Sequence, residues 1–176
     1  MSNDTKHDGP RIYVASLADY NAGRLHGVWI DLGDGIDAAD VHEAVQAMLA
    51  ESREPVAEEW AIHDHEGFHG LSVSEWSDFA ELCDLADLIA EYGEAFALFA
   101  GNVGQDYADR EGFEDAYQGV RESGRSFAME YAEECCAFDF DVPWPISCVD
   151  WDDAWRNLEG FYGIRGSEGF HVFRNI

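Results

Sequence analysis

Two segments near the start of the chain combine β-branched and aromatic side chains, as strands typically do. They are residues 11–15 (RIYVA) and 27–32 (GVWIDL). Residues 59–64 (EWAIHD) alternate in polarity like a half-buried strand. Since these strands are short and joined by turns, we expect residues 11–73 to form a small α+β domain around an antiparallel sheet.

The segment between the second and third strands predicts a helix. Asp37 or Asp40 is suited to cap its start, and the helix is expected to run to about Ser52. At 100° per residue, one face of this helix carries the apolar residues Val41, Val45, Met48 and Leu49.

Residues 74–108 are expected to form a helical middle domain. A helix is predicted from Ser74 to about Glu91, with Gly93 as its stop, and a shorter helix from Glu94 to Ala100. The long helix has an apolar side made of Trp76, Phe79, Leu82, Cys83, Ala86 and Ile89. Its opposite side is acidic and carries Glu81, Asp84, Asp87 and Glu91.

Residues 109–176 are expected to form a third domain, again α+β with an antiparallel sheet. Residues 123–135 predict a helix, Pro-Trp-Pro at 143–145 breaks the chain, and Asp150 caps a further helix. Alternating polarity in residues 169–174 (GFHVFR) predicts a closing strand. The fold class is therefore α+β, with three small domains.

Charge is the most unusual property of the chain. Thirty-seven Asp and Glu face ten Lys and Arg, which gives a formal net charge of −27. Residues 26–109 alone hold 20 acids and one base, whereas residues 1–25 are neutral. Such a field repels nucleic acid and anionic membranes and attracts basic surfaces. Adaptation to a salty cytoplasm is an alternative, but it predicts an even coat of acids.

The start of the chain and its cysteines bear on location. Residues 1–10 are polar and are expected to be a disordered extension without a secretory signal. No stretch reaches the roughly 18 apolar residues that a membrane span needs. The four cysteines include the adjacent Cys135 and Cys136 and form no Cys-x-x-Cys motif, so we expect reduced thiols and a cytoplasmic protein.

The acids of the middle domain have a spacing that suggests a role. Steps of three and four residues place neighbouring carboxylates about 4.5–6 Å apart along a helix axis. B-DNA carries one charge per about 3.4 Å on each strand, which is of the same order. A groove lined with Lys and Arg would accept such a row, because carboxylates take the same charge-assisted hydrogen bonds as phosphates. The carboxylates expected to form this surface are Asp31, Asp34, Asp37, Asp40, Glu43, Glu51, Glu54, Glu58, Glu59, Asp64, Glu66, Glu75, Asp78, Glu81, Asp84, Asp87, Glu91 and Glu94.

Several segments, in order along nearly the whole chain, resemble the ArdA-type antirestriction proteins of mobile genetic elements. They are residues 11–31 (RIYVASLADYNAGRLHGVWID), 58–64 (EEWAIHD), 113–119 (FEDAYQG), 127–134 (FAMEYAEE) and 171–174 (HVFR). The first of these segments is specific, and the later acidic ones are weak alone.

The resemblance implies a curved, elongated protein that dimerises through its C-terminal domain. Members of this family mimic bent B-form DNA and inhibit type I restriction–modification enzymes by filling their DNA site. The family has no compact catalytic motif, so the resemblance gives no residue a catalytic role. The chain departs from the family by its N-terminal extension and by Cys135-Cys136.

Three other interpretations stay open from the sequence. His63, His65 and His69 are candidate zinc ligands of a metal-dependent hydrolase, although no fourth ligand is evident. Residues 31–37 resemble a calcium loop but lack its ladder of acids. An acidic partner or chaperone of basic proteins is the main rival function. The aromatic residues at helical spacing are expected in cores, or in the third domain at a dimer interface; they are Trp76, Phe127, Tyr131 and Trp155.

Overall fold

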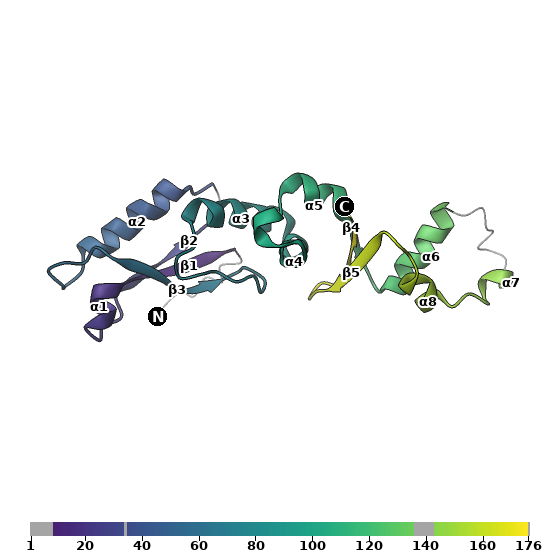
Figure 1. Ribbon diagram of the computed structural model, residues 1–176, viewed down its shortest axis with the longest axis horizontal. Helices are drawn as coiled ribbons and strands as arrows, with labels where there is room; N and C mark the ends of the chain where they lie inside the picture. Colours follow the sequence, from purple (N-terminus) through teal and green to yellow (C-terminus); the bar gives the residue numbers. More distant parts are fainter. Residues whose placement is uncertain (1–8, 34, 136–142, 176) are drawn as a thin grey trace, which may run out of the picture. The chain divides into compact units, whose positions relative to one another are not determined.

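The computed structural model describes residues 9–33, 35–135 and 143–175 (Figure 1). The chain divides into two compact units, one ending at Ala97 and one beginning at Leu98, and each contains helices and a three-stranded antiparallel sheet. This confirms the α+β class. The finer division into domains 11–73, 74–108 and 109–176 stays a prediction. In the described segments, no helix has the length and apolar character needed to cross a membrane.

The first unit is built on a sheet with the strand order β2-β1-β3. The strands are β1 (Arg11–Ser16), β2 (Gly27–Asp31) and β3 (Trp60–Glu66), at the positions predicted from the polarity pattern. Ile12 pairs with Ile30, and Val14 pairs with Ile62. All four of these side chains are buried, so one face of the sheet forms the core of the unit.

Helix α2 (Ala38–Ala50) covers the buried face of this sheet (Figure 1). Its buried residues are the four predicted ones, Val41, Val45, Met48 and Leu49. The cap is Asp37, which accepts hydrogen bonds from the backbone N–H groups of Ala39 and Asp40, while the Asp40 side chain accepts one from the N–H of Asp37. This reciprocal capping box satisfies backbone donors that would otherwise lack partners. A short helix, α1 (Leu17–Asn21), follows β1.

Helix α3 (Phe79–Tyr92) begins five residues later than predicted. Ser74, Glu75 and Trp76 precede it in a turn, because the carbonyl oxygen of Glu75 accepts a hydrogen bond from Ile62 N–H of β3. Asp78 caps the helix instead. The placement of Trp76 on the buried side was therefore wrong, and its side chain is 63% exposed. The expected stop is confirmed, because Gly93 forms the C-cap at a φ of 65°.

The second unit has the strand order β4-β6-β5, formed by β4 (Tyr117–Arg121), β5 (Phe161–Arg165) and β6 (Phe170–Arg174). The predicted helix appears as α6 (Gly124–Cys135), and the predicted cap, Asp150, begins α8 (Trp151–Arg156). The remaining helical elements are α4 (Glu94–Val103), η1 (Gln105–Tyr107), α5 (Arg110–Ala116) and α7 (Pro143–Ile146). The boundary between the two units falls within the sequence of α4.

Aromatic rings make up much of the interior of the second unit. Phe113 stacks on Tyr117 with ring centroids 4.9 Å apart and contacts Phe99 and Phe173. Around α6, Phe127 is buried and contacts three aromatic rings, and this confirms that it belongs to the core. Those rings belong to Tyr131, Trp155 and Phe161, and the guanidinium of Arg121 lies 5.8 Å from the centre of the Phe127 ring.

Candidate functional site

The predicted acidic surface belongs to the first unit, and most of its carboxylates are exposed. Asp34 lies outside the described residues, and Glu54 and Glu94 are half-buried. The exposed members are Asp31, Asp37, Asp40, Glu43, Glu51, Glu58, Glu59, Asp64, Glu66, Glu75, Asp78, Glu81, Asp84, Asp87 and Glu91.

Helix α3 separates apolar and acidic residues as its periodicity predicts. Its buried residues are Phe79, Leu82, Cys83, Ala86 and Ile89. Its exposed acids are Glu81, Asp84, Asp87 and Glu91, which follow one another at steps of three and four residues. Like charges at this spacing repel by about 0.2–0.5 kcal/mol per pair. Repulsion along the acidic face therefore destabilises α3, and burial of the apolar side of the helix offsets this cost.

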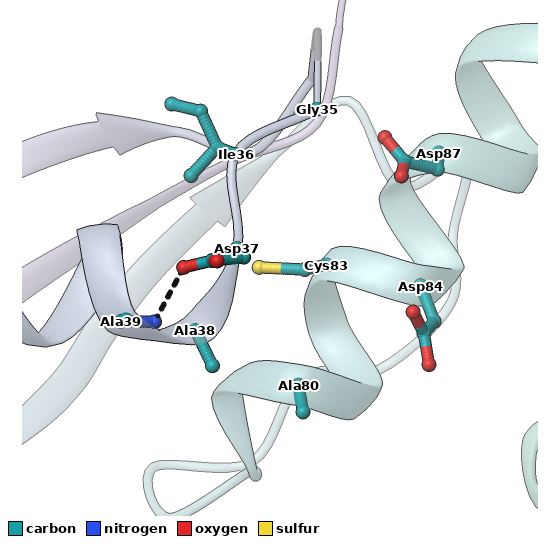
Figure 2. Close-up of a pocket in the computed structure, with 9 residues that line it drawn as sticks. All are labelled: Gly35, Ile36, Asp37, Ala38, Ala39, Ala80, Cys83, Asp84 and Asp87. Carbon is teal, nitrogen blue, oxygen red and sulfur yellow. Dashed lines mark hydrogen bonds between the residues drawn. The ribbon is translucent and has the colours of Figure 1, made fainter.

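Helices α2 and α3 bring together acids that are far apart in the sequence. An open hollow of about 370 Å³ lies between the N-terminus of α2 and the middle of α3, and Figure 2 shows its lining residues. Asp37 approaches from α2, while Asp84 and Asp87 project from α3. This meeting of two acidic segments could not be read from periodicity, because it depends on how the helices pack.

Cys83 lines this hollow, and the negative charges around it affect the pKa of its thiol. Burial raises the pKa of its thiol to about 11, and the charges of Asp87, Asp84, Asp37 and Asp40 add to the rise. A nearby negative charge disfavours a thiolate. The thiol is therefore protonated at neutral pH and unsuited to act as a nucleophile. The same shift indicates that carboxylates of both helices act on one point.

Two of the arginines in this unit are bound to acids within it. Arg24 forms ion pairs with Asp19 and with Glu54, and these interactions raise the pKa of its guanidinium. Arg11 binds Glu66 at 2.5 Å, and its guanidinium lies 4.6 Å from the centre of the Trp29 ring. The charges of Glu54 and Glu66 are therefore offset locally. Neither arginine lies on α2 or α3, where the acids of the hollow are found.

Asp19 is an acid whose role the sequence did not reveal. It is buried, and it accepts a hydrogen bond from the Ser52 hydroxyl in addition to those from Arg24. The Ser52 hydrogen bond and the Arg24 charge lower the pKa of Asp19. This carboxylate therefore holds the loop after α2 against α1 and is not part of the exposed surface.

The histidine candidates do not converge. A register shift between Tyr13 and Val14 leaves His63 as the extra residue on β3. The His63 ring lies edge-on to Tyr20, and the His65 ring lies edge-on to Phe68. Over the described ranges, no group of three or more His, Cys, Asp or Glu side chains is placed to hold a metal ion. In the calcium-like segment, Asp37 is engaged as the cap of α2.

A family model described as antirestriction protein (ArdA) matches residues 12–165, which is most of the chain. A search of curated proteins found no match.

Proposed function

Because this chain belongs to the ArdA family of antirestriction proteins, we propose that it inhibits a type I restriction–modification enzyme by occupying the DNA-binding groove of that enzyme. The carboxylates of the first unit stand in for the phosphates of B-form DNA. No step of this inhibition needs a catalytic residue or a cofactor. The family is one of inhibitors, and the partner is a protein and not a nucleic acid.

The observation that supports this proposal best is the two-helix acidic surface formed by α2 and α3. Exposed carboxylates of both helices surround one hollow, while Arg11 and Arg24 bind acids elsewhere in the unit. A surface shaped only for solubility normally intersperses both signs of charge. Here Asp37, Asp84 and Asp87 line the hollow and are exposed to a partner.

The physical basis is the exchange of one polyanion for another. A groove that binds duplex DNA places Lys and Arg at the positions of phosphates, and most of its affinity comes from those contacts. Carboxylate oxygens accept the same charge-assisted hydrogen bonds. Long-range attraction between opposite fields also speeds the encounter, and added salt screens it.

Two further properties belong to the proposal. We expect a homodimer formed through the C-terminal region, where the exposed Val120, Met129 and Val149 lie on the second unit. We also expect the protein to act in the cytoplasm, where restriction enzymes meet incoming DNA.

The test is competition between this protein and duplex DNA for a purified type I enzyme. We expect the protein and DNA to compete for the same site on the enzyme. The protein should then displace labelled DNA in proportion to the amount added, and the displacement should weaken as salt rises. A complex that holds protein and DNA together would contradict the proposal, as would inhibition that is unchanged across a wide range of salt.

A control separates this function from that of a general acidic partner. The protein is mixed with a basic, histone-like DNA-binding protein under the same conditions. The proposal expects much weaker binding to this protein than to the restriction enzyme. Equal binding to both would favour the acidic-chaperone function.

A further inference from the structure

Trp76 is a large aromatic side chain that folding leaves in solvent. Its side chain is 63% exposed, whereas Trp60 stacks on Phe79 at 4.6 Å and Trp29 lies beneath the Arg11 guanidinium. Single exposed aliphatic residues are common on protein surfaces, but tryptophan is enriched where partners bind. Trp76 is therefore a candidate contact for a partner.

The turn that carries Trp76 is held by several hydrogen bonds. The Ser74 N–H donates to the Ser77 hydroxyl at 2.9 Å, and the Ser77 N–H donates to the Ser74 carbonyl at 3.2 Å. The Trp76 N–H donates to the Ser74 hydroxyl at 3.3 Å. The Ile62 N–H of β3 binds the Glu75 carbonyl at 3.0 Å. A backbone fixed in this way loses little conformational freedom when the side chain is bound.

Charge identifies the kind of partner that this side chain would meet. Exposed Glu75 precedes Trp76, and Asp78, the cap of α3, follows two residues later. The exposed acids Glu81 and Asp84 come next along the helix. A partner surface that covers Trp76 therefore also meets carboxylates, which favours a cationic groove over an anionic or purely apolar surface.

We propose that Trp76 is the apolar anchor of the interface with the DNA-binding groove, and this inference rests on the proposed function. DNA offers a groove the apolar surfaces of sugars and bases as well as phosphates. Carboxylates reproduce only the phosphate contacts, whose strength falls with salt. The indole ring supplies contact area that salt does not screen, and it slows dissociation.

The experiment measures binding of the full chain to a purified type I enzyme over a series of salt concentrations, with association and dissociation rates. Trp76→Ala is compared with the wild type, with the conservative Trp76→Phe, and with Val56→Ala. Val56 is a matched control because its side chain is 69% exposed on the same unit. Since Trp76 is exposed, we expect every variant to fold, and circular dichroism and thermal unfolding check this.

We expect Trp76→Ala to bind about 30-fold more weakly, the change that corresponds to about 2 kcal/mol at a binding hot spot. The loss should appear as faster dissociation, with the same dependence on salt as the wild type. Trp76→Phe should recover much of the affinity, and Val56→Ala should match the wild type.

Two results would overturn the inference while leaving the proposed function intact. One is salt-sensitive binding by Trp76→Ala within twofold of the wild type, and the other is an equal loss in Val56→Ala. If the wild type itself fails to bind the enzyme or to compete with DNA, the proposed function falls and the inference falls with it.

Discussion

Arg24 Nη2 lies 3.2 Å from Oδ1 of Asp19, a carboxylate whose side chain is only 2% exposed. Removing a charge from water is costly unless it is paired and hydrogen-bonded. Arg24 and the Ser52 hydroxyl supply these interactions. Ser52 and Glu54, in the loop after α2, bind Asp19 and Arg24 and so join that loop to α1 and the segment after it, and one of the few cations of the first unit thus serves its fold.

The lowered pKa of Asp19 predicts how stability depends on pH. A carboxyl group whose pKa is lower in the folded state stabilises the protein above its unfolded pKa, for which the ordinary value is 3.8. That contribution is lost as the pH falls through and below this value. We expect Asp19→Asn to unfold at a lower temperature than the wild type at neutral pH.

The measurement is thermal unfolding of both proteins from pH 7 to pH 3. The gap between them should narrow as the pH falls below about 3.8, because Asp19 then takes up a proton in the unfolded wild type before it does so in the folded one. The comparison between variants matters, since protonation of the many surface acids also relieves repulsion in both proteins. A gap that stays constant over this range would contradict a lowered pKa of Asp19.

The field at the hollow between α2 and α3 predicts the titration of Cys83. Replacing Asp84 and Asp87 with asparagine removes two of the charges that raise the thiol pKa. We therefore expect the pKa to fall below about 11 but to stay above the ordinary value of 9.0, because burial is the largest cause. Alkylation rates against pH measure it, in a chain whose other three cysteines are replaced by serine.

An acid of the second unit provides the control for this titration. Glu159→Gln, on the second unit, should leave the Cys83 pKa unchanged, because the charges that raise the pKa of this thiol are those of Asp87, Asp84, Asp37 and Asp40. If the double variant also left the pKa unchanged, the acids would not act together on this point.

The acidic face of α3 predicts a conflict between stability and inhibition. The triple variant Glu81→Gln, Asp84→Asn, Asp87→Asn removes three like-charge pairs, two at a spacing of three residues and one, Asp87 with Glu91, at a spacing of four. We expect the stability to change in the favourable direction by about 0.2–0.5 kcal/mol per pair, while inhibition weakens and depends less on salt. Thermal unfolding and the DNA competition assay measure the two effects.

A matched variant on the second unit tests whether position matters. Glu133, Glu134 and Glu159 are also exposed, and their replacement by glutamine changes the net charge by the same amount. We expect inhibition close to that of the wild type. An equal loss of inhibition in both triple variants would indicate that total charge matters and that the α3 face does not.

Two substitutions of Asp78 can separate its role as the cap of α3 from the effect of its charge. Its carboxylate accepts hydrogen bonds from Ala80 N–H at 2.8 Å and from Glu81 N–H at 3.3 Å. Asp78→Ala should lower the free energy of unfolding by about 1 kcal/mol, whereas Asp78→Asn should lose much less, because asparagine caps almost equally well. Chemical denaturation checks this order, and equal losses in the two variants would contradict it.

Local sequence patterns predicted the parts of the fold that depend on nearby residues. The apolar face of α2 and the caps Asp37 and Asp150 are such cases, because periodicity and capping act within a few residues. The start of α3 was missed because the Glu75 carbonyl binds Ile62 of β3, a contact between distant parts of the chain. Strands β4 and β5 were missed as well.

In the candidate site, too, the features set by nearby residues were predictable and those set by contacts between distant segments were not. Exposure of Glu81, Asp84 and Asp87 followed from helical periodicity. The pairing of Glu54 with Arg24 and of Glu66 with Arg11 did not, since each joins segments far apart in sequence. The approach of Asp37 to α3 could not be predicted from periodicity either, because it depends on how α2 and α3 pack.

Four helices of the described chain begin at an aspartate whose carboxylate binds the backbone of the first turn: Asp37 for α2, Asp78 for α3, Asp109 for α5 and Asp150 for α8. Serine or asparagine would satisfy the same N–H groups without a charge. The positive end of a helix dipole makes these positions favourable for an anion. The chain thus gains part of its negative charge at sites where acidity strengthens the helix, and surface acidity and foldability can increase together.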